Sequence, residues 1–243
     1  MNEVLRQLNA RKSVRVFENR DIDESVVNAI LTAAAMAPTA GNQQLYTIIR
    51  VTDEEKKRSL AVSCDDQPFI ATAPLVLIFC ADCLKWYDAF RTADCEPRKP
   101  GVGDLLLAVS DTLIAAQNAV TAAESFGIGS CYIGDIMENC EIHRETLGLP
   151  RYVFPAAMLV FGYPTEQQKT REKPVRCDLE HIVHENKYRV MDACELREML
   201  MRDRDPEDYD RWIHAFCKRK YNSDFSREMT RSVAEFLKDF EEI

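Results

Sequence analysis

A basic cluster near the N-terminus, RKSVR at residues 11–15, is the first group of residues that could do chemistry. Three cations and a hydroxyl within five residues can hold a phosphate, because arginine offers forked donors, lysine a point charge and serine a short donor. Such a cluster is also typical of a solvated surface. It indicates an anion site only if other segments join it.

A glycine-punctuated segment, GIGSCYIGD at residues 127–135, is the second candidate. Its glycine spacing matches neither the dinucleotide-binding fingerprint nor the phosphate-binding P-loop. The glycines would let a flat ligand approach the backbone closely, where N–H groups could donate to it. The alternative is an ordinary turn from a helix into a strand.

A second basic segment, REKPVR at residues 171–176, follows an apolar run that ends in FGYP at 161–164. As a surface loop it would be unremarkable. Pro174 stiffens the backbone, which helps if Lys173 or Arg176 must hold a fixed position.

The elements that must position these segments follow from apolar periodicity. Helical spacing predicts helices over 2–10, from Asp23 to Pro38, over 104–126 and around 142–147, with two or three more in 192–243. Apolar runs predict strands over 46–51, 75–80, 130–134 and 156–162, and residues 163–176 are expected to be extended or a loop. The helix 104–126 is apolar nearly all round, which places it in a core or at a subunit interface.

Composition restricts the class of protein. The chain has 243 residues with 31 Lys and Arg against 40 Asp and Glu, a net charge of −9. This acidic balance argues against a general nucleic-acid binder and leaves a small anionic ligand open. The N-terminus lacks the apolar core of a secretory signal, and the longest apolar stretch, 71–81, is too short to span a bilayer. We therefore expect a cytoplasmic protein without a membrane partner.

The nine cysteines are odd in number and show no disulfide framework, which is typical of reduced thiols in the cytosol. Cys80 and Cys83 form a lone C-x-x-C, for which inert thiols are the expected interpretation. His181 and His184 could pair on a metal but lack a third ligand, so we expect no metal site.

Four segments together resemble one family. They are RKSVRVF (11–17), APTAGNQQ (37–44), GIGSCYIGD (127–135) and FGYP with KPVR (161–176). In order and spacing, residues 1–176 resemble the FMN-dependent nitroreductase and flavin reductase family. The closer likeness is to its larger branch, NADPH-dependent enzymes with an extended C-terminal region, which the acidic helical tail here resembles.

The resemblance implies FMN contacts at each segment. Arg11, Lys12 and Ser13 would contact the phosphate, with Arg176 as a helper. Arg15 and Lys173 would face N1 and O2 of the flavin, where a cation stabilises the reduced form. Thr39, Gln67 and Asn42 would contact the ribityl chain or the ring. Tyr132, Ile133, Gly134 and Asp135 would lie along the ring, with the Gly134 N–H donating to N5.

Two positions depart from the family pattern. The late motif often has Lys-Pro-Arg, whereas here Val175 separates Pro174 from Arg176. Asp135 stands where a second glycine is common, and we expect its side chain to point away from the flavin, since a carboxylate there would disfavour the reduced anion.

The resemblance also implies an α+β fold, in which a mixed, mainly antiparallel sheet lies between helices in three layers. The family is homodimeric, with FMN at the subunit interface. We expect an FMN-binding domain over 1–190 and a helical extension over 191–243.

The implied activity is ping-pong hydride transfer from NADPH or NADH through FMN to a small-molecule acceptor: a nitroaromatic, azo compound, quinone or free flavin. We expect no catalytic side chain, because the flavin carries the chemistry. Two alternatives stay open: another flavoenzyme on the same fold, such as a dehalogenase or a flavin-destroying enzyme, or a non-enzymatic flavin-binding redox sensor.

Overall fold

The computed structural model describes residues 1–241, and packing divides them into two compact units. The first unit holds residues 1–171 and the chain from 228 onward, and the second holds residues 172–227. These bounds differ from the expected division at residue 190. That residues 1–190 form the FMN-binding part stays a prediction.

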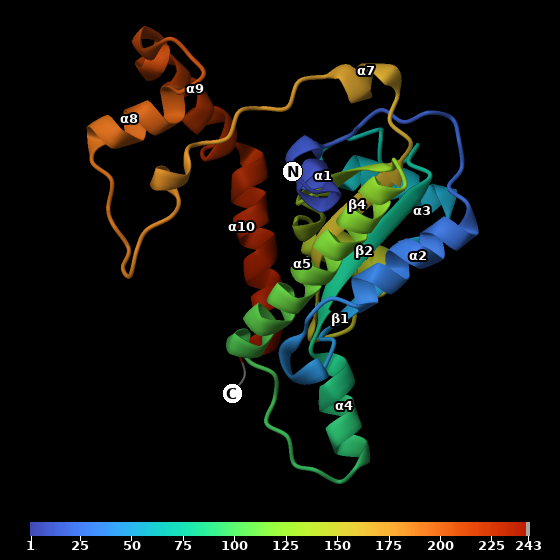
Figure 1. The fold of residues 1–243 in the computed structure, drawn as a ribbon. Coiled ribbons are helices and arrows are strands. Elements are labelled where there is room, and N and C mark those ends of the chain that lie inside the picture. The colour runs from blue at the N-terminus through green and yellow to red at the C-terminus, as the bar shows by residue number, and fades with distance from the viewer. Residues whose placement is uncertain (242–243) are drawn as a thin grey trace. The chain divides into compact units, whose positions relative to one another are not determined.

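The first unit contains most of the secondary structure (Figure 1). Its helices are α1 (Glu3–Ala10), α2 (Glu24–Ala35), α3 (Glu54–Ser63), α4 (Leu84–Thr92), α5 (Val102–Ser125), α6 (Cys140–Leu147) and α7 (Glu166–Thr170). Its strands are β1 (Tyr46–Val51), β2 (Leu75–Asp82), β3 (Gly129–Ile133) and β4 (Val153–Gly162). Short 3-10 turns include η1 (Ala40–Asn42) and η2 (Asp135–Met137).

The four strands form one sheet in the order β1-β2-β4-β3, and every neighbouring pair is antiparallel. Every residue of β2 and β4 is buried, which confirms the burial expected on both faces of the 75–80 strand. The register pairs Val76 with Val160 and Ile78 with Met158. The side chains of these central strands therefore supply the core on both sides of the sheet.

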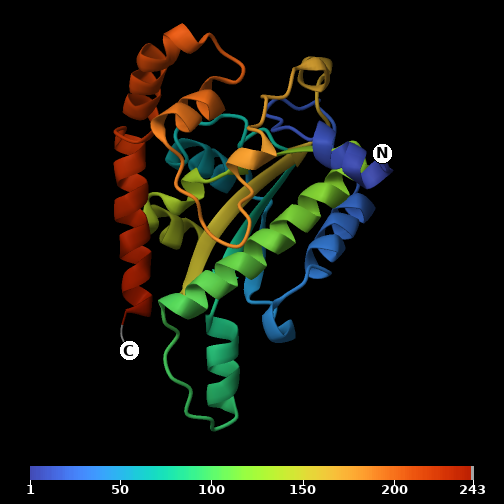
Figure 2. The same cartoon turned by 60° about the vertical axis from the view of Figure 1, so that its left-hand side comes forward.

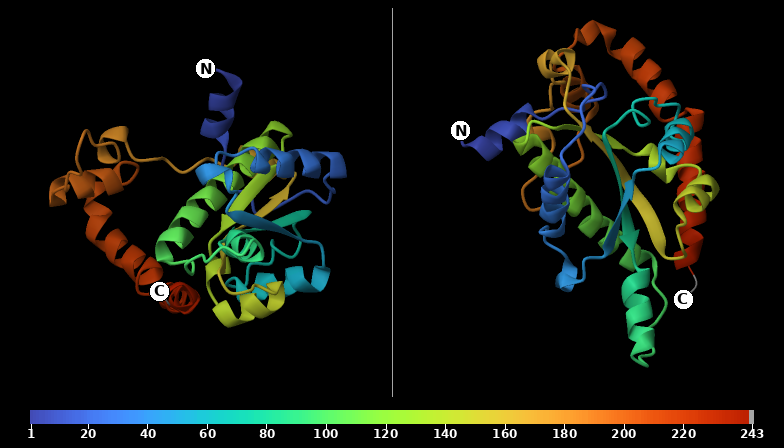
Figure 3. Two further views of the ribbon diagram at one scale, coloured as in Figure 1. Left: turned by 90° about the horizontal axis from the view of Figure 1, so that it is seen from below. Right: turned by 90° about the vertical axis from the view of Figure 1, so that its right-hand side faces the viewer.

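Helices cover both faces of this sheet (Figures 2 and 3). On one face α2 and α5 lie side by side, where Ile30 and Ala119 pack against alternate strand residues such as Leu77. On the other face Leu60 of α3 and Phe236 pack against the intervening residues. The predicted three-layer α+β fold is confirmed. The sheet is wholly antiparallel in its named strands, and one isolated parallel bridge joins Ser13 to Ser130.

The helix α5 confirms the long apolar helix expected over 104–126. It ends before Gly127, whose φ of +71° suits a left-handed residue after a helix. By length and composition alone α5 could cross a membrane, yet its most apolar stretch is already 44% buried inside the protein. A central core helix meets the same two criteria.

Three helices were not predicted correctly. Residues 163–176 are not wholly extended, because α7 forms over five of them, too short a stretch to show a helical period. The helices α3 and α4 were missed: α3 buries one narrow face of a highly charged sequence, and α4 buries no residue. Their periodicity is accordingly weak.

The second unit contains α8 (Ala193–Met201) and α9 (Tyr209–Lys220), and α10 (Asp224–Leu237) begins in it. These confirm the two or three helices expected after residue 192. Asp192 caps α8 by accepting from the N–H groups of Cys194 and Glu195.

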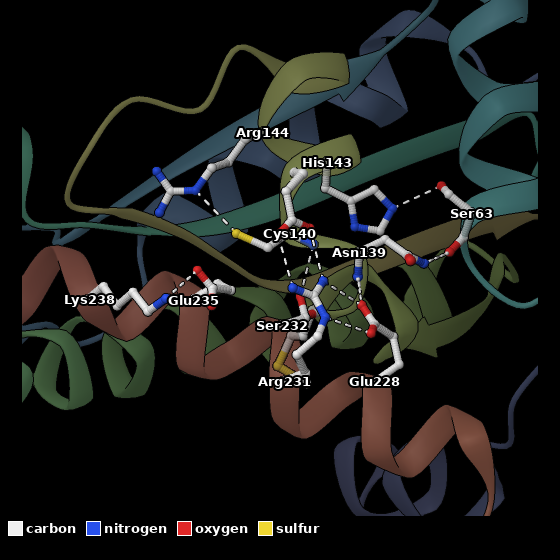
Figure 4. A network of polar contacts seen from close by, with 12 residues as sticks. Ser63, Asn139, Cys140, His143, Arg144, Glu228, Arg231, Ser232, Glu235 and Lys238 are labelled. Atoms are coloured by element: carbon white, nitrogen blue, oxygen red, sulfur yellow. Dashed lines mark hydrogen bonds and ion pairs between the residues drawn. The ribbon is translucent and has the colours of Figure 1, made fainter.

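From Glu228 onward, α10 belongs to the first unit and holds α6 in place (Figure 4). The buried Ser232 hydroxyl accepts from the N–H of Cys140 at 2.9 Å and donates to the carbonyl of Met137 at 2.7 Å. Glu228 accepts from the N–H of Asn139 at 3.1 Å. Side chains of α10 thus satisfy the donors at the start of α6.

Candidate active site

The basic cluster lies against the start of β3 because a glycine leaves room for it. Val14 N–H donates to the carbonyl of Ser130 at 2.9 Å, next to the parallel bridge between Ser13 and Ser130. A Cβ on Gly129 would lie 2.5 Å from Cγ2 of Val14. Two segments expected at the site, 11–15 and 129–135, are therefore brought together.

Arg11 carries buried donors without partners. Its Nε and Nη2 are both shielded from solvent and make no hydrogen bond, and its guanidinium carbon lies 5.8 Å from the centre of the Tyr132 ring. The Ser130 hydroxyl is also buried without a partner. Buried donors left unsatisfied are costly, so this arrangement indicates that an anion completes it.

Ser13 and Arg15 converge on the thiol of Cys131. Burial raises the pKa of Cys131, while the charge of Arg15 and a hydrogen bond from Ser13 oppose that rise. The guanidinium of Arg15 also lies 6.0 Å from the ring of Phe69. Three of the four polar residues predicted in the cluster thus gather beside β3.

The fourth, Lys12, is engaged elsewhere. Its Nζ donates to the carbonyl of Lys169 at 2.7 Å and to that of Arg171, at the end of α7. Arg171 in turn donates to the carbonyl of Ser13. Lys12 thereby ties the cluster to α7, and its predicted phosphate contact stays a prediction.

Two residues that support the cluster were missed. Arg171 belongs to the second basic segment, which did mark the region. Gln168, which is buried in α7, accepts from the N–H of Arg15 at 3.2 Å. Only the fold could identify it, because no pattern distinguishes one glutamine in a polar stretch.

Gln67 lies beside the end of β3. Its Nε2 donates to Oδ2 of Asp135 at 2.9 Å and to the carbonyl of Cys64 at 2.8 Å. Asp135 therefore points toward Gln67, another residue predicted to contact FMN. Its expected orientation away from the flavin stays a prediction.

Tyr132 and Ile133 of β3 pack on opposite faces of the sheet, and Gly134 follows the strand. Ile133 is buried, and burial raises the pKa of Tyr132 to about 12. Gly134 has space around it: an added Cβ would meet nothing nearer than Cε of Met137 at 3.9 Å. Among residues 1–241 nothing requires a glycine here, and a ligand that passes close to the backbone would explain it.

Thr39 and Asn42 lie in the η1 turn, which Asp111 of α5 holds. Asp111 is buried and accepts from the Thr39 hydroxyl and from the N–H of Ala40 at 3.1 Å. The Thr39 oxygen accepts from the N–H of Gln44 at 2.8 Å, so both its donor and one acceptor position are used. Asp111 is a further residue that sequence reasoning missed.

The η1 turn and the basic cluster lie at different levels of α5. Arg11 lines a small cavity with Val120 and Glu124, whereas the turn is held at Asp111. Nine residues separate Asp111 from Val120, or about 14 Å along the helix. Within one chain, the predicted cofactor residues therefore form two separate groups, one at the η1 turn and one at the basic cluster.

Lys173 and Arg176 lie in the second unit. Their predicted contacts with the flavin edge and phosphate stay predictions.

The C-x-x-C thiols are poor nucleophiles. Cys80 and Cys83 are buried, and burial raises the pKa of each to about 12. At neutral pH neither is a thiolate, the form that redox chemistry requires. Within residues 1–241, no three His, Cys, Asp or Glu side chains gather where they could hold a metal ion.

The sequence matches the profile of the Nitroreductase family over residues 8–163. A Bacillus subtilis protein named as an FMN reductase, NAD(P)H, is 31% identical over 97% of this chain and 91% of its own length. A Cr(VI) reductase from a Pseudomonas species is 33% identical over 77% of this chain and 75% of its own. The solved structure of an NADPH:FMN oxidoreductase from Vibrio harveyi, complexed with NAD+, superimposes with a TM-score of 0.78 at 26% identity, covering 97% and 98% of the two chains.

A sheet between two helical layers, with a basic cluster at the start of β3, defines a flavoprotein-like α+β scaffold. The chain belongs to the nitroreductase family, as its four segments indicated.

Proposed function

We propose that this protein is an FMN-dependent NAD(P)H oxidoreductase that passes two electrons to a nitroaromatic, a quinone or a free flavin in a ping-pong reaction. The single observation that supports it best is the half-buried Arg11, whose guanidinium nitrogens Nε and Nη2 are shielded from solvent and unpartnered. A terminal phosphate satisfies both donors with charge-assisted hydrogen bonds.

The residues around Arg11 fit the rest of FMN. The unpartnered Ser130 hydroxyl adds a short donor on the strand beside Arg11, Ser13 is bridged to Ser130, and the open backbone at Gly134 accommodates a flat ring. Arg15 brings a second cation to the same edge of β3. When bound, FMN supplies a ring that accepts and returns a hydride.

The protein then contributes binding and electrostatics. Arg11 and Ser13 hold the phosphate, which fixes where the ring lies. Arg15 stabilises negative charge that develops on the pyrimidine edge, and so favours electron transfer into the site. Lys173 would stabilise the same negative charge together with Arg15. No side chain needs to act as a nucleophile or a general base.

We propose further that the protein is a homodimer in which Thr39 and Asn42 of one copy face the basic cluster of the other. The separation of the two groups along α5 supports this arrangement. Apolar side chains on α5 and α1 also lie exposed, including Leu106, Leu113 and Leu5. A second copy that covers them would bury apolar surface and complete the site.

Colour and cofactor release test the proposal most directly. The purified protein should be yellow and should release FMN on heating. A colourless protein that takes up no added FMN contradicts the proposal.

Steady-state kinetics test the reaction. Oxidation of NADPH or NADH in the presence of a quinone or nitrofurazone should give parallel double-reciprocal lines, as a ping-pong reaction requires. Slow turnover of these acceptors, with activity only on a halogenated substrate, favours the dehalogenase alternative. Bound FMN that no nicotinamide reduces favours the redox sensor.

A further inference from the structure

Glu138 is a buried residue with one carboxyl oxygen that has no hydrogen-bond partner. It follows η2 directly and exposes only 5% of its surface, and its Oε1 is shielded from solvent and makes no hydrogen bond. A side chain of this kind has no evident structural role, because an unsatisfied buried oxygen costs stability. It therefore points to a function.

The groups that face Glu138 are mainly acidic. Asp135 of η2, Asp65 from the loop after α3, and Glu228 of α10 all act on it electrostatically. Arg231 of α10 is already paired with Glu228, as Figure 4 shows, and with Glu141 of α6.

Two further titratable neighbours, Cys64 and His143 of α6, supply no opposing charge. Burial and the charges of Asp135 and Glu138 raise the pKa of the Cys64 thiol, which stays neutral. The buried ring of His143 faces the carbonyl of Ile136 through Nδ1 at 2.9 Å and the Ser63 hydroxyl through Nε2 at 2.9 Å. Burial lowers its pKa, so the ring is neutral near pH 7. Burial and the three acidic neighbours together raise the pKa of Glu138 to about 7.

Asp135 links this carboxyl group to Gln67. The Gln67 amide faces two acceptors, the Asp135 carboxylate and the carbonyl of Cys64. A carboxylate and a carbonyl only accept, so both must receive the two N–H bonds of Gln67. The amide orientation is thereby fixed, and the Gln67 carbonyl is left to accept from a ligand.

We propose that Asp135 and Glu138 form a positioning pair for Gln67: Asp135 holds the amide so that its carbonyl accepts from a hydroxyl or N–H of FMN, and Glu138 holds or releases a proton beside Asp135. This inference rests on the proposed function, since it takes FMN as the ligand. Neutral Glu138 leaves one negative charge in the pair. Ionised Glu138 adds a second, which opposes a cofactor that is itself an anion.

The test measures FMN affinity of the apo-protein by quenching of flavin fluorescence at about pH 6 and about pH 8. Glu138→Gln keeps the shape and stays neutral, so it serves as the reference for the titration of the FMN phosphate itself. Wild-type affinity should match that of Glu138→Gln at the lower pH and be ~3- to ~10-fold weaker at the higher pH, as expected for one added charge nearby. A Glu138→Gln variant with the wild-type pH dependence overturns the proposal.

Asp135→Asn tests the other half of the pair. Asparagine can donate as well as accept, so Gln67 is no longer fixed, and affinity at about pH 6 should fall ~5-fold through loss of a charge-assisted hydrogen bond. The midpoint of the remaining pH dependence should move down, because Glu138 loses an anionic neighbour. The matched control, Asp66→Asn, removes a charge from an exposed residue in the loop that holds Gln67, and its φ of +49° suits asparagine. Equal affinities for Asp135→Asn and Asp66→Asn refute the positioning role.

Infrared spectroscopy separates this inference from the proposed function. The carbonyl stretching band of a protonated carboxyl group should be present in the apo-protein at about pH 6, fade through pH 7 and be absent from Glu138→Gln. Its absence from the wild type overturns the role of Glu138 even if FMN binds. Presence of the band in a protein that binds no FMN contradicts the proposed function instead.

Discussion

Replacing Arg11 by methionine should have opposite effects on the apo-protein and on the complex with FMN. Methionine keeps much of the packing beside Tyr132 and removes the charge. In the apo-protein, Nε and Nη2 of Arg11 are buried without partners. An unsatisfied buried donor costs about 1–3 kcal/mol, so its removal should stabilise the apo-protein by a similar amount.

The complex should lose affinity. Two charge-assisted hydrogen bonds to a phosphate contribute about 1.5–3 kcal/mol each, and the stabilisation of the apo variant adds to this loss, because affinity is the free-energy difference between the complex and the apo-protein. Even a loss of ~3 kcal/mol, at the low end of this range, raises the Kd of FMN by a factor of ~150. Because a ligand stabilises in proportion to the logarithm of its concentration over Kd, FMN should raise the Tm of the variant much less.

The assay is thermal unfolding with and without added FMN, together with a fluorescence titration of the apo-protein. Without FMN, the Tm of Arg11→Met should exceed the wild-type value by about 2–4 °C for each kcal/mol gained. The control is Arg6→Met, which removes the same charge from an exposed ion pair with Glu3 on α1 and should leave the Kd unchanged. A Kd within twofold of the wild type, or a lower Tm for the apo-protein, would refute the reasoning.

Three further predictions concern the elements around the site. Gly129→Ala should lower the free energy of unfolding by ~1–3 kcal/mol in a denaturant melt, since the new Cβ would lie 2.5 Å from Val14. Gly134→Ala should unfold like the wild type but bind FMN more weakly. Equal unfolding curves for the two variants contradict this prediction. The free energy of unfolding should decline by up to ~3 kcal/mol as the pH rises from about 4.5 to 7, because the pKa of Glu138 is raised to about 7 in the folded protein. The same decline in Glu138→Gln would show that another group is responsible. Ser232→Ala should lower the Tm by several degrees through a loss of ~1–3 kcal/mol, since two buried backbone groups lose their partner; an unchanged Tm would show that water replaces the hydroxyl.

The fold was largely predictable because its main elements carry strong local signals. The strands β2 and β4 are continuous apolar runs, and α5 is a long apolar helix that ends at a glycine, so composition alone marks them. In contrast, α4 buries no residue and α7 has only five, which leaves no period to detect.

The candidate site was predictable at the level of segments. The basic cluster and the glycine segment were expected to meet, and the structure joins them through Val14 and Ser130. Individual roles were harder to foresee. Nothing local distinguishes Lys12, which ties down the end of α7, from Arg11, whose donors stay unpartnered.

By itself, the sequence determined which segments carry charge, which are buried and which family they resemble, because residue type and spacing are local properties. The tertiary structure alone decided which polar groups meet partners from distant parts of the chain. Asp111 holds a turn some 70 residues away, at Ala40, and Asp135 fixes Gln67 across 68 residues. Such pairings depend on how helices and strands pack. Only the folded structure therefore determines which polar side chains have hydrogen-bond partners within the chain and which remain free to bind a ligand.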